Sequence, residues 1–426
     1  MIAFQVIRYR MMINLSEPFY NFTPMKNYII SLTLILLFIG NNLYAQAPNM
    51  VKDATNKSIK VGAERTSLYL PLLKGKVVGI IANHTSMIGK VHIVDSLVSL
   101  GIKVNVIFAP EHGFRGTAGT GEESENSLDT KTGIPIISLF GKHTAPNAKD
   151  LQGVDIVLFD IQDVGVRFYT YLSTLHLVMQ ACADNKKPLL ILDRPNPNGF
   201  YVDGPVLDKK FSTFVGMDVV PIVHGCTLAE FAMMINGEGW LKNNIRCDLT
   251  YILCENYHHA DYYQLPIKPS PNLTTMSAVY LYPTLGLFEG TPVSVGRGTD
   301  KPFEMIGYPN FKKGNHKFIP KTIPNMAKNP PYEGVECNGL NLKQFGDVYI
   351  KNTKQIYLYW LKALYDDYPN KEKFFSPFFD QLAGTSMLRT QIKNNIGEDA
   401  IRMSWQTDIK AYKIIRKKYL LYDDFE

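Results

Sequence analysis

The chain has 426 residues, of which 46% are hydrophobic and 20% are charged, so it has room for about two or three domains and is too apolar to be mainly disordered. Its five cysteines are too few for a disulfide-stapled scaffold. The net charge of +6 is modest for this length, and without a clustered basic face it indicates no nucleic-acid partner.

The N-terminal segment has the pattern of a secretory leader. Lys26 precedes an apolar run over residues 28–39, and small residues follow up to Ala45. A basic start, a short apolar segment and a small-residue cleavage site indicate export, and the run is shorter than the roughly 20 residues of a membrane span. We expect residues 1–45 to be a leader that starts at Met25, leaving a periplasmic or extracellular protein with no stable membrane span. A retained anchor is the alternative.

From about residue 70, short β-rich apolar runs alternate with helical stretches. The runs lie, in chain order, at residues 77–82, 104–109, 155–161, 188–192 and, more weakly, 219–223. The helical stretches lie at 92–100, 171–185 and 227–241. Continuous apolar runs are typical of strands buried on both faces of a parallel sheet, and Thr227 with Glu230 forms a capping box for the third helix. The alternation predicts an open, doubly wound α/β fold.

A second region begins near residue 280. Prolines, glycines and aromatic residues become frequent over residues 266–331, and the regular alternation of strand and helix ends there. We therefore expect a larger α/β domain over residues 55–283 and a smaller domain over residues 284–426.

Polar and charged residues follow the apolar runs where the predicted strands end. In an open parallel sheet, ligands bind outside the carboxyl ends of the strands, so loops from separate strands should converge on one edge. The candidate site residues from these loops are His84, Glu111, His112, Arg115, Asp160, Asp163, Arg167, Tyr169, Asp193, Arg194, Asn196 and His224. Asn272, Glu289 and Arg297 come from later loops.

Glu111 is the first candidate for a catalytic acid because it directly follows a buried strand and precedes His112. A helix cap or an ion pair with Arg115 is the alternative role. Glycoside hydrolysis usually needs a second carboxylate across a cleft, for which Asp163 ranks before Asp160 and Glu289. We expect His112 and His224 to position the substrate.

Four arginines are candidate anion clamps, because a guanidinium matches a carboxylate bidentately. They are Arg115, Arg167, Arg194 and Arg297, and a structural salt bridge is the alternative for each. Tyr169 is a candidate for stacking on a sugar face, and buried core is its alternative role.

Several familiar chemistries have no motif in this chain. It contains no dinucleotide fingerprint, no phosphate-binding loop, no His-Glu-x-x-His and no Gly-x-Ser-x-Gly elbow. We expect no cofactor and no metal. A metal held by His84, His112 and His224 is the alternative. Cys247 and Cys254 could form a disulfide, which the sequence leaves open.

Six ordered blocks together resemble the NamZ exo-β-N-acetylmuramidases, a family long described as a domain of unknown function. The blocks are residues 111–116, 160–171, 193–198, 269–273, 287–291 and 296–299. The resemblance covers roughly residues 70–426. Pro292 and Val295 depart from the family pattern, in which Asn and Glu are common at those places.

The resemblance implies a Rossmann-like domain, a smaller C-terminal α/β domain and an active-site cleft between them. It implies release of N-acetylmuramic acid from the non-reducing ends of peptidoglycan fragments, in cell-wall turnover and recycling, with Glu111 as the catalytic glutamate and no bound nucleotide. Peptidoglycan-derived muramyl saccharides are the expected partners. A periplasmic saccharide-binding protein without turnover, or cleavage by elimination rather than hydrolysis, is the alternative.

Overall fold

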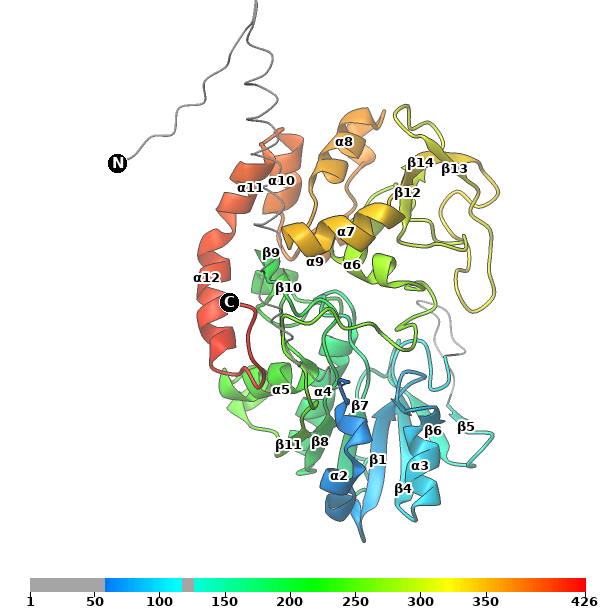
Figure 1. Cartoon of the computed structure of the whole chain (residues 1–426), viewed down its shortest axis with the longest axis vertical. Coiled ribbons are helices and arrows are strands. Elements are labelled where there is room, and N and C mark those ends of the chain that lie inside the picture. Colours follow the sequence, from blue (N-terminus) through cyan, green and yellow to red (C-terminus); the bar gives the residue numbers. More distant parts are fainter. Residues whose placement is uncertain (1–57, 117–125) are drawn as a thin grey trace, which may run out of the picture. The chain divides into compact units, whose positions relative to one another are not determined.

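A mainly parallel β-sheet forms the centre of the first half of the fold, the described residues up to 275 (Figure 1). The computed structural model describes residues 58–116 and 126–426, so the predicted leader lies outside the described residues. Within these ranges the sheet has seven strands in the order β11-β8-β7-β1-β4-β6-β5. Neighbouring strands are parallel except for β5 and β6. The strands are β1 (Val77–Ala82), β4 (Lys103–Ala109), β5 (Ser127–Leu128), β6 (Pro135–Ser138), β7 (Ile156–Asp160), β8 (Leu189–Leu192) and β11 (Leu249–Ile252).

The four strong apolar runs of the sequence form the adjacent central strands β8, β7, β1 and β4. Successive side chains of a strand point to opposite faces of the sheet. In β7, Val157 and Phe159 enter one buried apolar cluster, whereas Ile156 and Leu158 enter the other. Both faces of the sheet are therefore covered, which explains why these runs are apolar without alternation.

Helices cover the two faces of the sheet. Residues of α2 (Thr66–Leu73) and α3 (Ile93–Ser99) belong to the smaller cluster, whereas residues of α4 (Tyr171–Asp184) and α5 (Leu228–Gly237) belong to the larger one. The capping box at the start of α5 is confirmed: the Glu230 amide donates to Thr227 Oγ1 at 3.4 Å, and the Thr227 amide donates to Glu230 Oε2 at 2.8 Å. The prediction of an open, Rossmann-like α/β sheet is confirmed.

The weak run at residues 219–223 is not a strand of this sheet, so that prediction was wrong. It forms β10 (Pro221–Val223), which pairs antiparallel with β9 (Asp203–Val206) in a separate two-stranded sheet. Pro221 has no backbone N–H to donate to a central ladder. The place beside β8 is taken by β11.

The second half of the fold, residues 276–426, is smaller and combines helices with a short antiparallel sheet. It contains α6 (Met276–Leu285), the 3-10 helix η4 (Gly286–Gly290) and a three-stranded antiparallel sheet of β12 (Met305–Tyr308), β14 (Cys337–Asn341) and β13 (His316–Phe318). Six helices follow: α7 (Lys343–Thr353), α8 (Tyr359–Asp367), α9 (Pro377–Ala383), α10 (Met387–Lys393), α11 (Glu398–Ser404) and α12 (Gln406–Lys417). The expected boundary at residues 283–284 falls inside α6, and the larger apolar cluster contains residues from both halves.

The last helix returns to the first half of the fold (Figure 1). From α12, the Tyr412 hydroxyl donates to the His224 carbonyl at 2.6 Å, and Arg416 Nε donates to the Gly225 carbonyl at 2.9 Å. These bonds anchor the C-terminal helices to the loop after β10.

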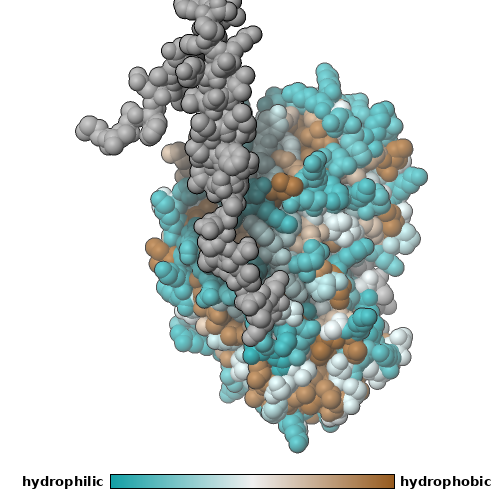
Figure 2. Space-filling model, viewed as in Figure 1, coloured by the Kyte–Doolittle hydropathy of each residue, from teal (hydrophilic) through white to brown (hydrophobic). Residues whose placement is uncertain are grey.

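On the visible face, hydrophobic residues lie in small patches among hydrophilic ones (Figure 2). No helix in the described ranges has the length and apolar character needed to cross a membrane.

All five cysteines are buried free thiols, so Cys247 and Cys254 are not bonded to each other.

Candidate active site

A pocket of about 230 Å³ lies where the two halves of the fold meet, beyond the carboxyl ends of β4 and β7. The first half contributes Glu111, His112, Phe140, Phe168, Tyr169, Thr170, Phe214, Val215, Ser270, Asn272 and Leu273. The second half contributes Tyr282, Glu289, Arg297, Phe303, Phe378 and Leu382. Six of these residues were predicted as site residues: Glu111, His112, Tyr169, Asn272, Glu289 and Arg297.

A tight turn after β4 presents Glu111 to the pocket. His112 is in the left-handed region with a φ of 74°, and the Gly113 amide donates to the Pro110 carbonyl at 3.0 Å. Non-glycine residues adopt this conformation rarely, and they do so mostly where the surrounding structure fixes it. The turn therefore fixes the point at which Glu111 leaves the strand.

Two residues at the start of α4 hold Glu111 in place. Thr170 Oγ1 donates to Glu111 Oε2 at 2.9 Å, and the Tyr171 hydroxyl donates to the Glu111 carbonyl at 3.3 Å. Thr170 is the N-cap of α4, but its side chain makes no capping bond. Its hydroxyl is thus committed to the Glu111 carboxylate rather than to the helix.

Glu289 and Arg297 form an ion pair in the wall contributed by the second half. Arg297 Nε and Nη2 contact Glu289 Oε1 at 2.8 and 2.7 Å, and the guanidinium lies 5.1 Å from the centre of the Phe303 ring. Burial lowers the pKa of Arg297, but the charge and hydrogen bond of Glu289, together with Tyr282 and Glu111, outweigh the effect of burial and the net pKa is raised. Arg297 therefore remains a cation in the pocket.

Aromatic rings form much of the remaining wall. Tyr282 makes edge-on contacts with Phe168, Tyr169 and Phe303, at centroid distances of 5.2, 5.9 and 5.0 Å. Phe378 is 37% exposed and also lines the pocket. Such a mixture of apolar rings and a few fixed polar groups is typical of a small-molecule site.

The segment 269–273 also reaches the pocket, through Ser270, Asn272 and Leu273. The Tyr169 hydroxyl donates to the Pro269 carbonyl at 2.7 Å, and Asn272 Nδ2 donates to the Met326 carbonyl at 2.7 Å. These bonds join the loop after β7, this segment and the second half of the fold around the pocket.

The structure places three of the four predicted arginine clamps outside the pocket. Arg194 pairs bidentately with Asp160 at 2.6 and 2.9 Å in a fully buried position, so Asp160 is outside the pocket as well. Arg115 contacts Asp129 at 2.8 Å and Asp95 at 3.2 Å. Both arginines have the structural ion pairs that were the alternative to ligand binding.

Arg167, the third of these arginines, is fully buried. It donates to the carbonyls of Pro205, Val220 and Leu382 at 2.8, 2.7 and 3.0 Å. Burial lowers its pKa to about 9. Its role is to join the loop after β7 to α9, and we leave it out of the proposed site.

Asp163 and His224 lie behind the pocket rather than in its lining. Asp163 Oδ2 accepts from the Gly165 amide at 2.6 Å and lies 4.0 Å from His224 Nε2. Burial raises the pKa of Asp163 to about 7 and lowers that of His224 to about 3. The second carboxylate in the pocket is Glu289, which the sequence ranked last of three candidates.

Three further predicted residues also hold loops together. Asp193 accepts from the Ala229 amide at 3.0 Å and from the Tyr422 hydroxyl at 2.7 Å. Asn196 Nδ2 donates to the Cys226 carbonyl at 2.9 Å, and His84 Nε2 contacts the Lys268 carbonyl at 2.8 Å. None of the three lines the pocket.

The sequence patterns did not single out Thr170, Tyr282 or Phe303. Thr170 directly follows Tyr169 in the loop after a predicted strand, and this position could have indicated a site residue. Tyr282 and Phe303 lie in the aromatic-rich region without a regular strand pattern, and nothing there distinguished a wall residue from a core residue.

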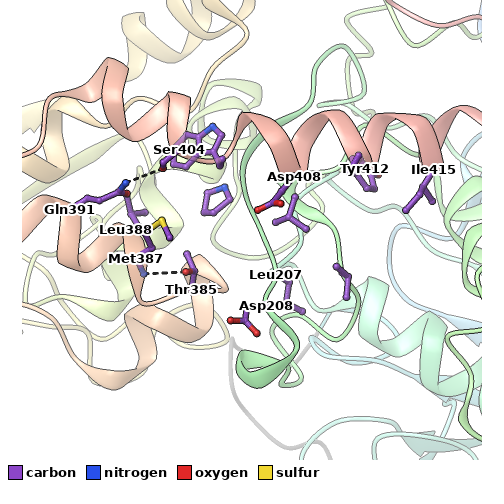
Figure 3. A pocket seen from close by; sticks show the side chains of 15 residues that line it. Leu207, Asp208, Thr385, Met387, Leu388, Gln391, Ser404, Asp408, Tyr412 and Ile415 are labelled. Carbon is purple, nitrogen blue, oxygen red and sulfur yellow. Dashed lines mark hydrogen bonds between the residues drawn. The ribbon is translucent and has the colours of Figure 1, made fainter.

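Another pocket, of about 430 Å³, lies between the β9 loop and helices α10 and α12 (Figure 3). Leu207 and Asp208 face Met387, Leu388 and the α12 side chains across it. None of the predicted site residues lines this pocket. In residues 58–116 and 126–426, no group of three or more His, Cys, Asp or Glu side chains is placed to hold a metal ion.

Comparison with known proteins identifies the family. The family model of the N-terminal domain of exo-β-N-acetylmuramidase NamZ matches residues 78–277, and that of its C-terminal domain matches residues 280–422. The chain belongs to the NamZ family. It is 36% identical over 421 residues to peptidoglycan β-N-acetylmuramidase NamZ of Bacillus subtilis strain 168, covering 93% of this chain and all of the relative.

Solved structures of similar proteins share the fold. A DUF1343 family protein from Bacteroides fragilis NCTC 9343 is 47% identical with a TM-score of 0.80, and the match covers 86% of this chain and 99% of that one. A second DUF1343 protein of the same organism is 27% identical with a TM-score of 0.70 and the same coverage. This NamZ protein is accordingly an enzyme of the glycoside hydrolase class.

Proposed function

We propose that this NamZ protein hydrolyses peptidoglycan fragments from their non-reducing ends and releases N-acetylmuramic acid, with Glu111 as general acid and base. The relative from Bacillus subtilis is named a peptidoglycan β-N-acetylmuramidase. The single observation that carries the residue assignment is that Glu111, oriented by Thr170, lines a pocket between the two halves of the fold.

The size of the pocket supports action on a terminal sugar. Its volume of about 230 Å³ lies below the roughly 300–1,000 Å³ of sites for drug-sized ligands. A pocket this small suits one sugar unit, and the exposed ring of Phe378 offers an apolar surface at its edge. An exo-acting enzyme needs this combination, because it holds one terminal sugar and leaves the rest of the chain outside.

The chemistry assigned to Glu111 has two steps. As a carboxylic acid it protonates the glycosidic oxygen while the bond between that oxygen and the anomeric carbon of N-acetylmuramic acid breaks, which leaves positive charge on that ring. As a carboxylate it then accepts a proton from the water whose oxygen bonds to the anomeric carbon, which gives free N-acetylmuramic acid and returns Glu111 to its acid form. The Thr170 hydroxyl restricts rotation of the carboxyl group, so that one orientation serves both steps.

The cellular role is part of the same proposal. The leader pattern around Lys26 and Ala45 supports export, and a muramyl substrate is a component of the cell wall. We assign the enzyme to the periplasm or the cell exterior, where it would take part in cell-wall turnover and recycling.

The test uses the disaccharide of N-acetylmuramic acid β-linked to N-acetylglucosamine. Hydrolysis gives free N-acetylmuramic acid, whereas elimination gives an unsaturated sugar of lower mass, and mass spectrometry distinguishes the two. Binding without release of any sugar would show a saccharide-binding protein and contradict the proposal.

Glu111→Gln tests the residue assignment, because the amide keeps the shape of the side chain but cannot transfer the proton. We expect turnover to be lost and the melting temperature to be retained. Glu336→Gln is the matched control, since Glu336 is exposed and pairs with Lys317 outside the pocket. Near-normal activity of Glu111→Gln would refute the assignment.

A further inference from the structure

We infer that Arg297 is the residue that selects a sugar carrying a carboxylate, and that Glu289 positions it for this role. The inference rests on the proposed function, because it concerns the lactyl carboxylate that distinguishes N-acetylmuramic acid from N-acetylglucosamine. Arg297 is the one arginine or lysine among the described residues that line the pocket.

Arg297 keeps donors for a ligand. A guanidinium has five N–H groups, and the contacts of Arg297 with Glu289 use the edge formed by Nε and Nη2. No described residue accepts a hydrogen bond from Nη1, and Nη1 is not among the buried atoms without a partner. The side chain is 17% exposed and lines the pocket, so we take Nη1 as the end of the guanidinium that it offers to a ligand.

The other predicted clamps lack such donors in the pocket. Arg194 uses Nε and Nη2 for Asp160 and the Met87 carbonyl, and Arg167 is enclosed by three carbonyls. Both are buried, and neither lines the pocket. The accessible end of Arg297 is therefore the group available to a substrate carboxylate.

Glu289 does not exclude a second carboxylate from Arg297. The same protein shows a guanidinium between two acids: Arg115 contacts Asp129 at 2.8 Å and Asp95 at 3.2 Å. A substrate carboxylate on Arg297 would likewise place two acids on one guanidinium, with the second acid on Nη1 rather than on Nη2 as in Arg115. Glu289 and the Phe303 ring, 5.1 Å from the guanidinium, hold its plane in a fixed direction, and a fixed fork loses little conformational freedom on binding.

The position of Arg297 also orients the sugar. Glu111 lies in the first half of the fold and Arg297 in the second, and both line the same pocket. The charge of Glu111 acts on the pKa of Arg297, so the two groups are within electrostatic reach. A sugar bound with its lactyl carboxylate at Arg297 and its glycosidic oxygen at Glu111 spans the pocket from one half to the other.

The experiment pairs a change in the enzyme with a change in the substrate. The substrates are a chromogenic β-glycoside of N-acetylmuramic acid and the same glycoside with its lactyl carboxylate converted to the amide, which removes the charge and keeps the shape. A charge-assisted bond corresponds to roughly 10- to 150-fold in kcat/KM. We expect the wild type to prefer the acid by this factor and Arg297→Gln to lose the preference.

Controls separate failure of the inference from failure of the proposed function. Arg389→Gln removes an arginine paired bidentately with Asp380 outside the pocket, and it should keep the wild-type preference. Glu289→Gln should reduce the preference without abolishing it. If Arg297→Gln does not fold, Arg297→Lys replaces it, because Lys keeps the charge without the fork and should lower the preference.

Two results are decisive. If the wild type cleaves the acid substrate and the Arg297 variant that folds shows an unchanged ratio of acid to amide, the inference is wrong and the proposed function stands. If the wild type cleaves neither substrate, the proposed function itself is wrong.

Discussion

Replacing Thr170 with Val tests whether the Thr170 hydroxyl acts on Glu111 rather than on the helix it precedes. Valine keeps the shape of threonine and removes the hydroxyl. The lost bond is the 2.9 Å contact from Thr170 Oγ1 to Glu111 Oε2, and a hydrogen bond to a charged group contributes about 1.5–3 kcal/mol. Because each 1.36 kcal/mol is tenfold in rate, we expect kcat to fall by roughly 10- to 150-fold.

The structure also predicts what the Thr170→Val variant should not change. Thr170 makes no side-chain capping bond to α4, so the stability of the helix should not change, and the free energy of unfolding should fall by no more than the contribution of the lost bond to Glu111, about 1.5–3 kcal/mol. The matched control is Thr227→Val, which removes the 3.4 Å capping bond from the Glu230 amide. That variant should lose about 0.5–2 kcal/mol of stability and keep the wild-type kcat.

The assay measures kcat and KM with the muramyl glycoside, together with urea unfolding of both variants. Thr170→Ser should recover most of the rate, because it restores a hydroxyl. A Thr170→Val variant that folds and keeps the wild-type kcat would refute the reasoning.

Two further predictions concern buried carboxyl groups outside the pocket. Asp160→Asn leaves the buried Arg194 without its counter-charge, so urea unfolding should show a loss of about 3–5 kcal/mol in the free energy of unfolding. The folded variant should keep its kcat, and a large drop in kcat would contradict the placement of Asp160 outside the pocket. Burial raises the pKa of Asp163 from 3.8 to about 7, so the native state keeps a proton that the unfolded chain releases, and stability falls as pH rises from 4 to 7. The stability difference between wild type and Asp163→Asn should therefore fall by on the order of 4 kcal/mol over this range, and a pH-independent difference would show that Asp163 ionises normally.

The central sheet could be predicted from the sequence because a strand that is buried on both faces has apolar residues at successive positions. β1, β4, β7 and β8 appear as continuous apolar runs for this reason. The run at residues 219–223 is also apolar, but it contains Pro221 and pairs with β9 outside the central sheet. The residues of β9 form no continuous apolar run that would have predicted this pairing. After residue 340 the sequence predicts only short helical and strand-like segments, such as residues 354–365, which overlap α8.

The candidate site was predictable as a set of loops but not residue by residue. The position of Glu111 directly after a strand was sufficient to find it. Arg167, in contrast, is enclosed partly by the Leu382 carbonyl, which lies 215 residues further along the chain. Its neighbours in the sequence look like those of a binding residue, and only the distant contact shows that its Nη1 and Nη2 groups bind main-chain carbonyls of the protein itself. The same holds for Arg194, whose partner Asp160 precedes it by 34 residues.

The distribution of the pocket over the chain has a consequence for synthesis. Glu111 and its partner Thr170 belong to the first half, but Glu289, Arg297, Phe303 and Leu382 complete the pocket. A nascent chain that has produced only the parallel sheet carries the proposed acid without the pocket residues of the second half. With Glu111 as the acid, we expect activity only once nearly all of the sequence has been made and the second half has folded onto the first.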